Sequence, residues 1–272
     1  FYELGDNIKL WKGLKLIAID GSSAFLISGN EANTVYKGAR NKYGSYPLCR
    51  FMKMHDVLNN ITLKVDMLTM EGSERKCAYK WIDAIPDNSL TLFDRGFPSF
   101  TLFFLLQNCE KPKAFIARCK LDFSNSIKAF AASAGKSQMI SFYADERARA
   151  ILLSHGYMVS KETCITLRVE KILLPNGITE VLITSITDTK ILSSQELKLL
   201  YKQRWGIETA IGREKNLLQL ENYSSHLLQG IEQDFYATFI AANIHSLIAG
   251  QAQSMIEKMC NKSKYAQQLN YS

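Results

Sequence analysis

The chain has 272 residues, of which 47% are hydrophobic and 11% aromatic, and this composition excludes a disordered or fibrous protein. Its 33 Lys and Arg against 26 Asp and Glu give a formal net charge of +7. This charge favours a polyanionic partner, with nucleic acid as the first candidate. A basic surface without such a partner would account for the charge equally well.

The six cysteines are scattered, with no Cys-x-x-Cys pair and no histidine cluster beside them. Neither a zinc site nor a disulfide framework is indicated, and a reducing cytoplasmic compartment fits this usage. The apolar segment from Phe235 to Gly250 is interrupted by Asn243, His245 and Ser246 and is too short to span a bilayer. The chain begins without Met in the middle of a pattern, so we expect that an N-terminal part is missing.

The first part of the chain alternates expected strands and helices. The apolar run LKLIAIDGS at 14–22 predicts a buried strand that ends at Asp20, and polar residues at 29–44 predict a loop or hairpin. A second strand is expected at 61–70 and a helix at 73–85. A third strand, SLTLFDRGF, is expected to end at Asp94, before a buried helix with the sequence FPSFTLFFLLQN.

From Lys111 onward the pattern becomes rich in expected strands. They fall at 113–121, 136–143, 164–174 and 178–186, with a short helix at 144–156. Pro-Asn-Gly joins the last two strands, which is a hairpin signal. After a cap at Ser193 or Ser194, one long helix and a last helix from about Glu232 are expected. The order predicts an α/β core interrupted by a β-rich module.

Two of the expected strands end in an acid that a glycine follows closely, Asp20 in AIDG and Asp94 in FDRG. In open α/β sheets functional groups gather at the carboxyl ends of strands. An acid at the end of an apolar strand needs a pairing partner, water or a metal ion. Each Asp alone could instead start a turn, as Asp-Gly sequences commonly do, so both interpretations stay open.

The segment YKQRWGIETAIGREK, from Tyr201 to Lys215, predicts a helix with four polar residues on one side. At about 100° per residue, Arg204, Glu208 and Lys215 fall within about 60° of Tyr201, on the side that also carries apolar residues. The polar stripe is therefore predicted to face the protein, where its basic and phenolic groups suit phosphate oxygens. An ordinary Arg204–Glu208 helix pair would explain two of the four residues.

Asp20, Asp94 and Glu208 together predict a set of oxygen ligands for two Mg²⁺ ions, with Mn²⁺ as the alternative metal. Two such ions can activate water or a 3′-hydroxyl and stabilise the leaving oxygen of a phosphoryl transfer. This chemistry needs no nucleophilic side chain. The sequence contains no G-x-S-x-G, Walker or Cys/His signature, which agrees with that expectation.

The spacing Y-x2-R-x3-E-x6-K in YKQRWGIETAIGREK resembles the YREK signature of the insertion-sequence-four family of DDE transposases. LKLIAIDGS resembles the family's strand with the first Asp, and LTLFDRGFPSF resembles its strand with the second. LRVEKILLPNGITEVLITSI looks like the end of the family's β insertion, and LENYSSHLLQGIEQDFYATFIAANI looks like the helices after the motif. The resemblance covers nearly the whole chain.

The resemblance implies an α/β fold, a ribonuclease-H-like mixed sheet with flanking helices, interrupted by a β-rich insertion. The expected domains are the first part of the catalytic core at 1–108, the insertion at 109–188, and the second part of the core with the YREK helix at 189–272. The family's usual N-terminal DNA-binding region is not found in this sequence.

The implied activity is metal-dependent cleavage of transposon ends, followed by strand transfer of the 3′-hydroxyl into target DNA. By resemblance, Asp20, Asp94 and Glu208 would be the catalytic residues and metal ligands, and Tyr201, Arg204 and Lys215 would contact DNA. The implied partners are the transposon ends and the target DNA, with a homodimer in the DNA complex and no membrane. The implied location is the bacterial cytoplasm, in association with the nucleoid.

Two other functions are compatible with the sequence. One is a domesticated or truncated transposase that binds DNA without cutting it, and the other is a ribonuclease-H-like nuclease that acts on DNA without terminal repeats. The basic stretch with Lys111, Lys113, Arg118 and Lys120 could track a DNA backbone. A solvated strand with ordinary basic residues is the favoured interpretation.

Overall fold

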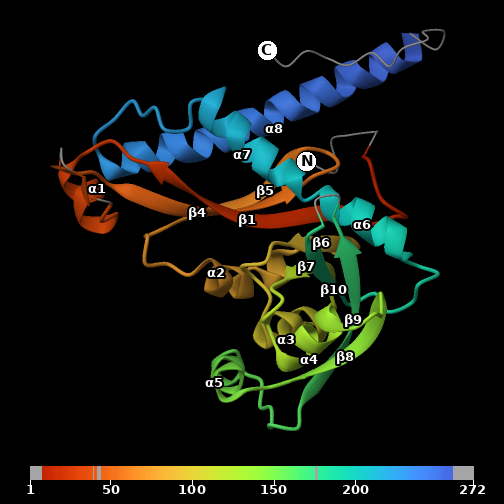
Figure 1. Cartoon of the computed structure of the whole chain (residues 1–272). Helices are drawn as coiled ribbons and strands as arrows, with labels where there is room; N and C mark the ends of the chain where they lie inside the picture. The colour runs from red at the N-terminus through yellow and green to blue at the C-terminus, as the bar shows by residue number, and fades with distance from the viewer. Residues whose placement is uncertain (1–7, 39, 42–43, 175–176, 260–272) are drawn as a thin grey trace. The chain divides into compact units, whose positions relative to one another are not determined.

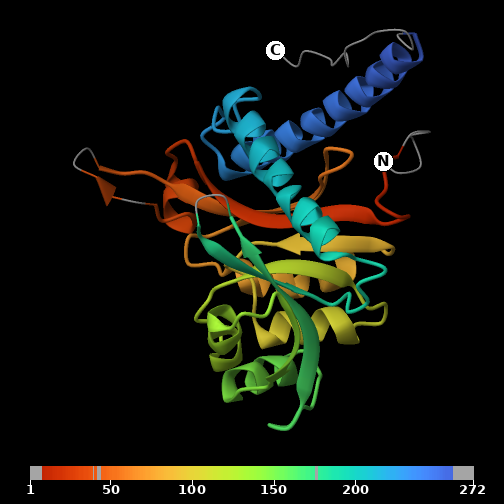
Figure 2. The ribbon, with the colours of Figure 1, turned by 45° about the vertical axis from the view of Figure 1, so that its right-hand side comes forward.

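The computed structural model describes residues 8–38, 40–41, 44–174 and 177–259, and Figures 1 and 2 trace the chain from two directions. The chain divides into two compact units. Unit 1 consists of Phe1–Lys15, Gly21–Gly72 and Gly206–Ser272, and unit 2 of Leu16–Asp20 and Ser73–Trp205. Residues 175–176 of the predicted Pro-Asn-Gly turn lie outside the described residues.

Strand β1 (Lys15–Phe25) is common to both units, because the boundary between them falls between Asp20 and Gly21. Leu16, Ile17, Ala18 and Ile19 are fully buried, which confirms the strand predicted from the apolar run. The strand continues to Phe25, so the prediction that it ends at Asp20 is wrong. The later residues stay extended because β4 (Leu48–Asp56) is the neighbouring strand, and its backbone groups satisfy theirs.

Unit 2 contains the strands that follow β1 in the sheet. They are β6 (Ser89–Phe93), β7 (Ala114–Cys119), β10 (Thr179–Thr184), β9 (Cys164–Leu173) and β8 (Ser137–Tyr143), in the order β1-β6-β7-β10-β9-β8. The pair β6 and β7 is parallel, and the pairs from β7 to β8 are antiparallel. All of β6 is buried, as expected for a strand in the middle of a sheet covered on both faces.

The helices of unit 2 follow the predicted order, with one addition. They are α2 (Glu74–Lys80), the 3₁₀ helix η1 (Ile82–Ala84), α3 (Phe100–Asn108), α4 (Asn125–Ala132), α5 (Glu146–Ser154) and α6 (Ser194–Lys202). Helix α3 contacts β7 and β9 (Figure 1), and the rings of Phe103 and Phe115 stack with centroids 4.9 Å apart. Helix α4 was not predicted, because only Ile127 and Phe130 of its residues are buried.

Unit 1 contains β4 (Leu48–Asp56) and β5 (Ile61–Leu68), in the order β5-β4-β1. Since β1 is common to both orders, the strands make one eight-stranded mixed sheet. The predicted mixed sheet with flanking helices is therefore confirmed. The segment predicted as a loop or hairpin holds α1 (Asn30–Val35) and the short pair β2 (Arg40–Asn41) and β3 (Gly44–Ser45). No helix among the described residues is long and apolar enough to cross a membrane.

Helix α8 (Leu228–Met259) lies along β5 in both views of unit 1 (Figures 1 and 2). Asn243 joins the two elements, because its side chain accepts a hydrogen bond from the Thr62 N–H at 2.7 Å and donates one to the Thr62 carbonyl at 2.8 Å. Phe51 of β4 packs against Phe235 and Phe239 of α8, with ring centroids 5.5 and 6.0 Å away. This helix supplies much of the apolar cover of its unit.

The single long helix predicted after Ser194 is wrong. The chain forms α6, which ends at Lys202, and α7 (Trp205–Asn216). Between them the backbone tightens, and the Arg204 N–H donates to the Tyr201 carbonyl three residues back, as in a 3₁₀ turn. The prediction that Tyr201, Arg204, Glu208 and Lys215 share one side of a continuous helix therefore does not hold across this break. Ile207 and Ile211 are nevertheless buried on α7, as expected.

Candidate active site

Asp20 and Asp94 lie on neighbouring strands of unit 2. Asp20 is in β1, and Asp94 directly follows β6, the next strand in the sheet. Their side chains are 19% and 26% exposed, so both carboxylates can be reached from solvent. The predicted proximity of the two acids is thus supported by the strand order, although only Asp94 stands at the end of its strand.

Arg204 holds the two carboxylates together. One guanidinium nitrogen lies 3.2 Å from Asp20 Oδ2, and the other terminal nitrogen lies 4.0 Å from Asp94 Oδ1. The Arg204 side chain is only 4% exposed, and its guanidinium carbon lies within 6 Å of the rings of Tyr201 and Trp205, at 5.8 and 5.7 Å. Such contacts favour a guanidinium, so Arg204 is a fixed positive charge between two acids.

Tyr201, the last-but-one residue of α6, is buried in the same unit. Burial raises the pKa of its phenol far above the ordinary value, so the hydroxyl keeps its proton at neutral pH. Within the described residues, Tyr201 Oη has no hydrogen-bond partner. A buried donor of this kind costs free energy unless a ligand or water accepts from it.

Arg118 of β7 is a second cation beside Asp94. One terminal nitrogen lies 2.7 Å from Asp94 Oδ1 and the other 2.7 Å from Glu180 Oε1 on β10. Acidic and basic side chains therefore alternate in the series Asp20, Arg204, Asp94, Arg118 and Glu180. The sequence singled out Arg118 only as a candidate for a DNA backbone contact, and it gave no reason to select Glu180. The signal lies in the strand register, which sets Arg118 opposite Leu182, two residues from Glu180.

Glu208 and Lys215 belong to unit 1, on α7. Glu208 is partly exposed in the first turn of the helix, where the helix dipole favours a negative charge. Lys215 donates a hydrogen bond to the Ser23 carbonyl, and its Nζ lies 3.6 Å from Glu221. Four of the predicted residues are therefore in unit 2 and two in unit 1, and the union of all six in one site stays a prediction.

The donor atoms of unit 2 suit a divalent cation in part. Asp20 and Asp94 offer carboxylate oxygens, the ligand type that Mg²⁺ prefers, and each already attracts a guanidinium. Among the described residues, however, no group of three or more His, Cys, Asp or Glu side chains is arranged to hold a metal ion. Unit 2 thus brings two carboxylates together, and their role as metal ligands stays a prediction.

A buried ion pair fixes α7 to β4 within unit 1. Lys53 Nζ donates to Glu214 Oε1, and both side chains are almost completely buried. Burial lowers the pKa of Lys53 to about 8 and raises the pKa of Glu214. Gly206, at the start of α7, lets the helix approach the chain just after β4, since a Cβ there would lie 3.2 Å from Val57 Cβ.

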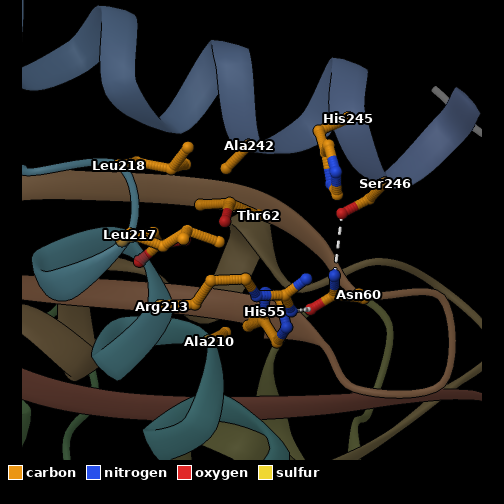
Figure 3. A pocket seen from close by; sticks show the side chains of 11 residues that line it. His55, Asn60, Thr62, Ala210, Arg213, Leu217, Leu218, Ala242, His245 and Ser246 are labelled. Carbon is orange, nitrogen blue, oxygen red and sulfur yellow. Dashed lines mark hydrogen bonds between the residues drawn. The ribbon is translucent and has the colours of Figure 1, made fainter. Parts of the chain in front are cut away.

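A cavity of about 100 Å³ lies in the same unit, beside α7, α8 and the ends of β4 and β5 (Figure 3). Arg213 donates to Asn60 at 2.8 Å, and Asn60 donates to Ser246 at 2.8 Å. Burial holds the pKa of His55 well below its ordinary value, so its ring is neutral. His55 Nδ1 has no hydrogen-bond partner among the described residues.

A solved structure of a piggyBac transposase synaptic complex with hairpin DNA is similar, with a TM-score of 0.57 at 10% identity over 89% of this chain and 48% of that one. This likeness bears on the fold alone. The NurA nuclease of Sulfolobus solfataricus reaches a TM-score of only 0.30 at 11% identity, over 92% of this chain and 86% of that one, which is too low to carry an argument.

The sequence comparisons are more specific. The "Putative transposase InsZ" of Escherichia coli strain K12 is 32% identical over 99 residues, which make up 35% of this chain and 33% of that relative. The chain thus matches about a third of the length of this curated relative. The family described as the transposase DDE domain matches residues 11–244, a span that includes all six predicted site residues. The chain belongs to the DDE transposase family.

Proposed function

We propose that this chain is the catalytic region of a DNA transposase that cuts transposon ends and joins the liberated 3′-hydroxyl to target DNA. The observation that carries the proposal is the pair of solvent-accessible acids, Asp20 and Asp94, on adjacent strands of a DDE transposase domain. The finer assignment to the insertion-sequence-four family rests on the YREK spacing of Tyr201, Arg204, Glu208 and Lys215.

Asp20 and Asp94, with Glu208 as the third ligand, would hold two Mg²⁺ or Mn²⁺ ions. Bound there, the ions would activate the attacking water or 3′-hydroxyl and stabilise the leaving oxygen. In each step a new oxygen–phosphorus bond forms as an old one breaks, and the attacking hydroxyl loses a proton while the leaving 3′-oxygen gains one. The carboxylates would hold the ions in place, and no covalent bond to the protein forms.

The basic and phenolic residues would hold the DNA. For Arg204 this role rests on the motif spacing alone, because its guanidinium is buried and lies between Asp20 and Asp94. Tyr201 Oη keeps a proton that it can donate to a phosphate oxygen, and Lys215 adds a further positive charge. Transposon-end and target DNA are the proposed partners, bound by a homodimer in the bacterial cytoplasm, and the boundaries at 108 and 188 remain part of the proposal.

The test is nicking of a plasmid that carries the element's own ends, identified as inverted repeats in the genomic flanks. Asp94→Asn and Glu208→Ala should each lower the Mg²⁺-dependent nicking rate on the order of a thousandfold or more. The matched control is Asp87→Asn, an exposed acid of unit 2 that pairs with Lys111 and Lys113, and it should nick at the wild-type rate. If Glu208→Ala nicks as fast as the wild type, the assignment of Glu208 is wrong.

A further inference from the structure

Three isoleucines of helix α8 are exposed to solvent. Ile240, Ile244 and Ile248 are 58%, 50% and 62% exposed, and we call these three residues the isoleucine stripe. Because they follow one another at intervals of four residues, they form a single row along the helix. Met255 is 64% exposed and continues the row toward the end of α8. Large apolar side chains that gather on one exposed face indicate an interaction surface.

The isoleucine stripe lies on the side of α8 that faces away from the sheet of unit 1. The opposite side is buried and includes Phe235, Phe239 and Asn243, where α8 runs along β5 (Figures 1 and 2). Each stripe residue comes five positions after one of these three, and five residues turn a helix by about 140°. Helix α8 is therefore apolar on two sides, of which unit 1 covers one.

The segment around the stripe carries no formal charge. From Phe235 to Ile256 the sequence has no Asp, Glu, Lys or Arg, although these residues make up 22% of the chain. A DNA backbone is bound by cations, and a helix that lies on a lipid surface has Lys and Arg beside its apolar face. Two copies of this chain, each with a net charge of +7, repel one another where basic surfaces meet. An uncharged face is thus the surface through which they associate most readily.

A second copy also fits the spacing of the stripe. Two identical chains pair about a twofold axis, which brings the same surface of each chain together. With the two α8 helices antiparallel and the axis beside Ile244, Ile240 of one copy faces Ile248 of the partner subunit. The antiparallel orientation also places the positive end of each helix dipole near the negative end of the other.

We propose that the isoleucine stripe is the contact surface between two copies of this chain, with their α8 helices antiparallel about Ile244. The inference deepens the proposed function, because it names the surface of the proposed homodimer, and it rests on that function only for the role of holding two DNA ends. A standard interface buries about 800 Å² on each partner. One helix face covers less, so the dissociation constant should be on the order of 10 µM.

Sedimentation equilibrium of the whole chain without DNA measures this association. Ile244→Lys and Ile244→Glu should each weaken it at least about tenfold, because each places two like charges at the axis. An equimolar mixture of the two variants should associate again, since opposite charges then meet. The matched control is Leu153→Lys, which adds the same charge on α5 of unit 2 at a leucine that is 62% exposed. It should associate as tightly as the wild type.

A second pair of mixtures tests the orientation of the helices. In the antiparallel arrangement, Ile240→Lys mixed with Ile248→Glu should associate more tightly than either variant alone. Ile240→Lys mixed with Ile240→Glu should show no such gain, because the two substituted positions do not meet. The reverse result would overturn the antiparallel arrangement. Circular dichroism checks that each variant folds, as expected for substitutions at exposed positions.

The surface and the proposed function can fail separately. A wild type that stays monomeric at about 100 µM, ten times the expected dissociation constant, overturns the surface, and so does an Ile244→Lys variant that associates like the wild type. A monomer that binds phosphatidylglycerol vesicles through the stripe would make it a lipid-binding face and would also overturn the proposal. If the monomeric wild type nicks transposon ends, the proposed function stands, whereas a dimer that fails to nick them overturns that function and leaves the surface in place.

Discussion

Tyr201 carries a buried hydroxyl for which the described residues provide no hydrogen-bond partner. A buried hydroxyl without a partner lowers the stability of the fold, because an unsatisfied donor costs about 1–3 kcal/mol. Tyr201→Phe should therefore leave the free energy of unfolding unchanged or raise it by about 1 kcal/mol. The same substitution should weaken DNA binding, since the phenol is proposed to donate to a phosphate. Urea denaturation and a DNA-binding titration measure the two effects.

Tyr79 supplies the matched control for this prediction. Its hydroxyl lies 2.9 Å from Ser99 Oγ, so Tyr79→Phe should lower the free energy of unfolding by about 1 kcal/mol. It should leave DNA binding unchanged. A loss of stability in Tyr201→Phe as large as that in Tyr79→Phe would show that the Tyr201 hydroxyl is bonded inside the protein.

The buried ion pair of Lys53 and Glu214 joins helix α7 to β4. Removal of one partner leaves a buried charge without compensation, which costs about 3–5 kcal/mol. Lys53→Met should therefore lower the free energy of unfolding by roughly that amount. In the double variant Lys53→Met with Glu214→Leu, stability should return close to the wild-type value, because an apolar pair can replace a buried ion pair. Urea denaturation of the single and double variants checks both values.

The same variants should also change the nicking activity, because the ion pair lies on helix α7. Since α7 carries Glu208, the single variant should lose nicking activity together with α7 attachment, and the double variant should recover both. A double variant whose loss of stability equals the sum of the two single losses would contradict the assigned role of the ion pair.

The net charge of +7 should appear in the salt dependence of DNA binding by the whole molecule. The logarithm of the association constant falls linearly with the logarithm of salt concentration, with a slope set by the number of phosphates that the protein neutralises. Lys215→Gln should make that slope shallower by about one. The control is Lys161→Gln, at a side chain that is 80% exposed and near Glu162, and it should leave the slope unchanged. Fluorescence anisotropy over a salt series gives both slopes, and equal slopes for Lys215→Gln and the wild type would exclude a phosphate contact.

The elements that could be predicted from the sequence are those in which consecutive residues are apolar and buried. The apolar runs of β1, β6 and α3 were found because almost every side chain in them is buried. The break at Arg204 was not found, because it depends on tertiary contacts that override a continuous helical pattern. The extension of β1 past Gly21 also depends on a neighbouring strand, which is distant in the sequence.

The candidate site shows the same division. The acids Asp20 and Asp94 could be predicted, since each follows an apolar run and a glycine comes within two residues of each. The bridge from Arg118 to Glu180 could not, because it depends on the register between β7 and β10, and 62 positions separate the two residues. Motif spacing records neighbours along one helix, whereas a cross-strand contact is fixed only when the sheet forms.

Helices α7 and α8 pack against strands that are synthesised much earlier than the helices themselves. The bond between Lys53 and Glu214 joins residues 161 positions apart, and that between Thr62 and Asn243 joins residues 181 positions apart. On the ribosome, β4 and β5 therefore emerge long before the helices that cover them, while every strand and helix of unit 2 that follows them is made in between. Contacts this distant slow folding, and exposed strands invite aggregation. We expect the nascent chain to need a chaperone until α8 has been made.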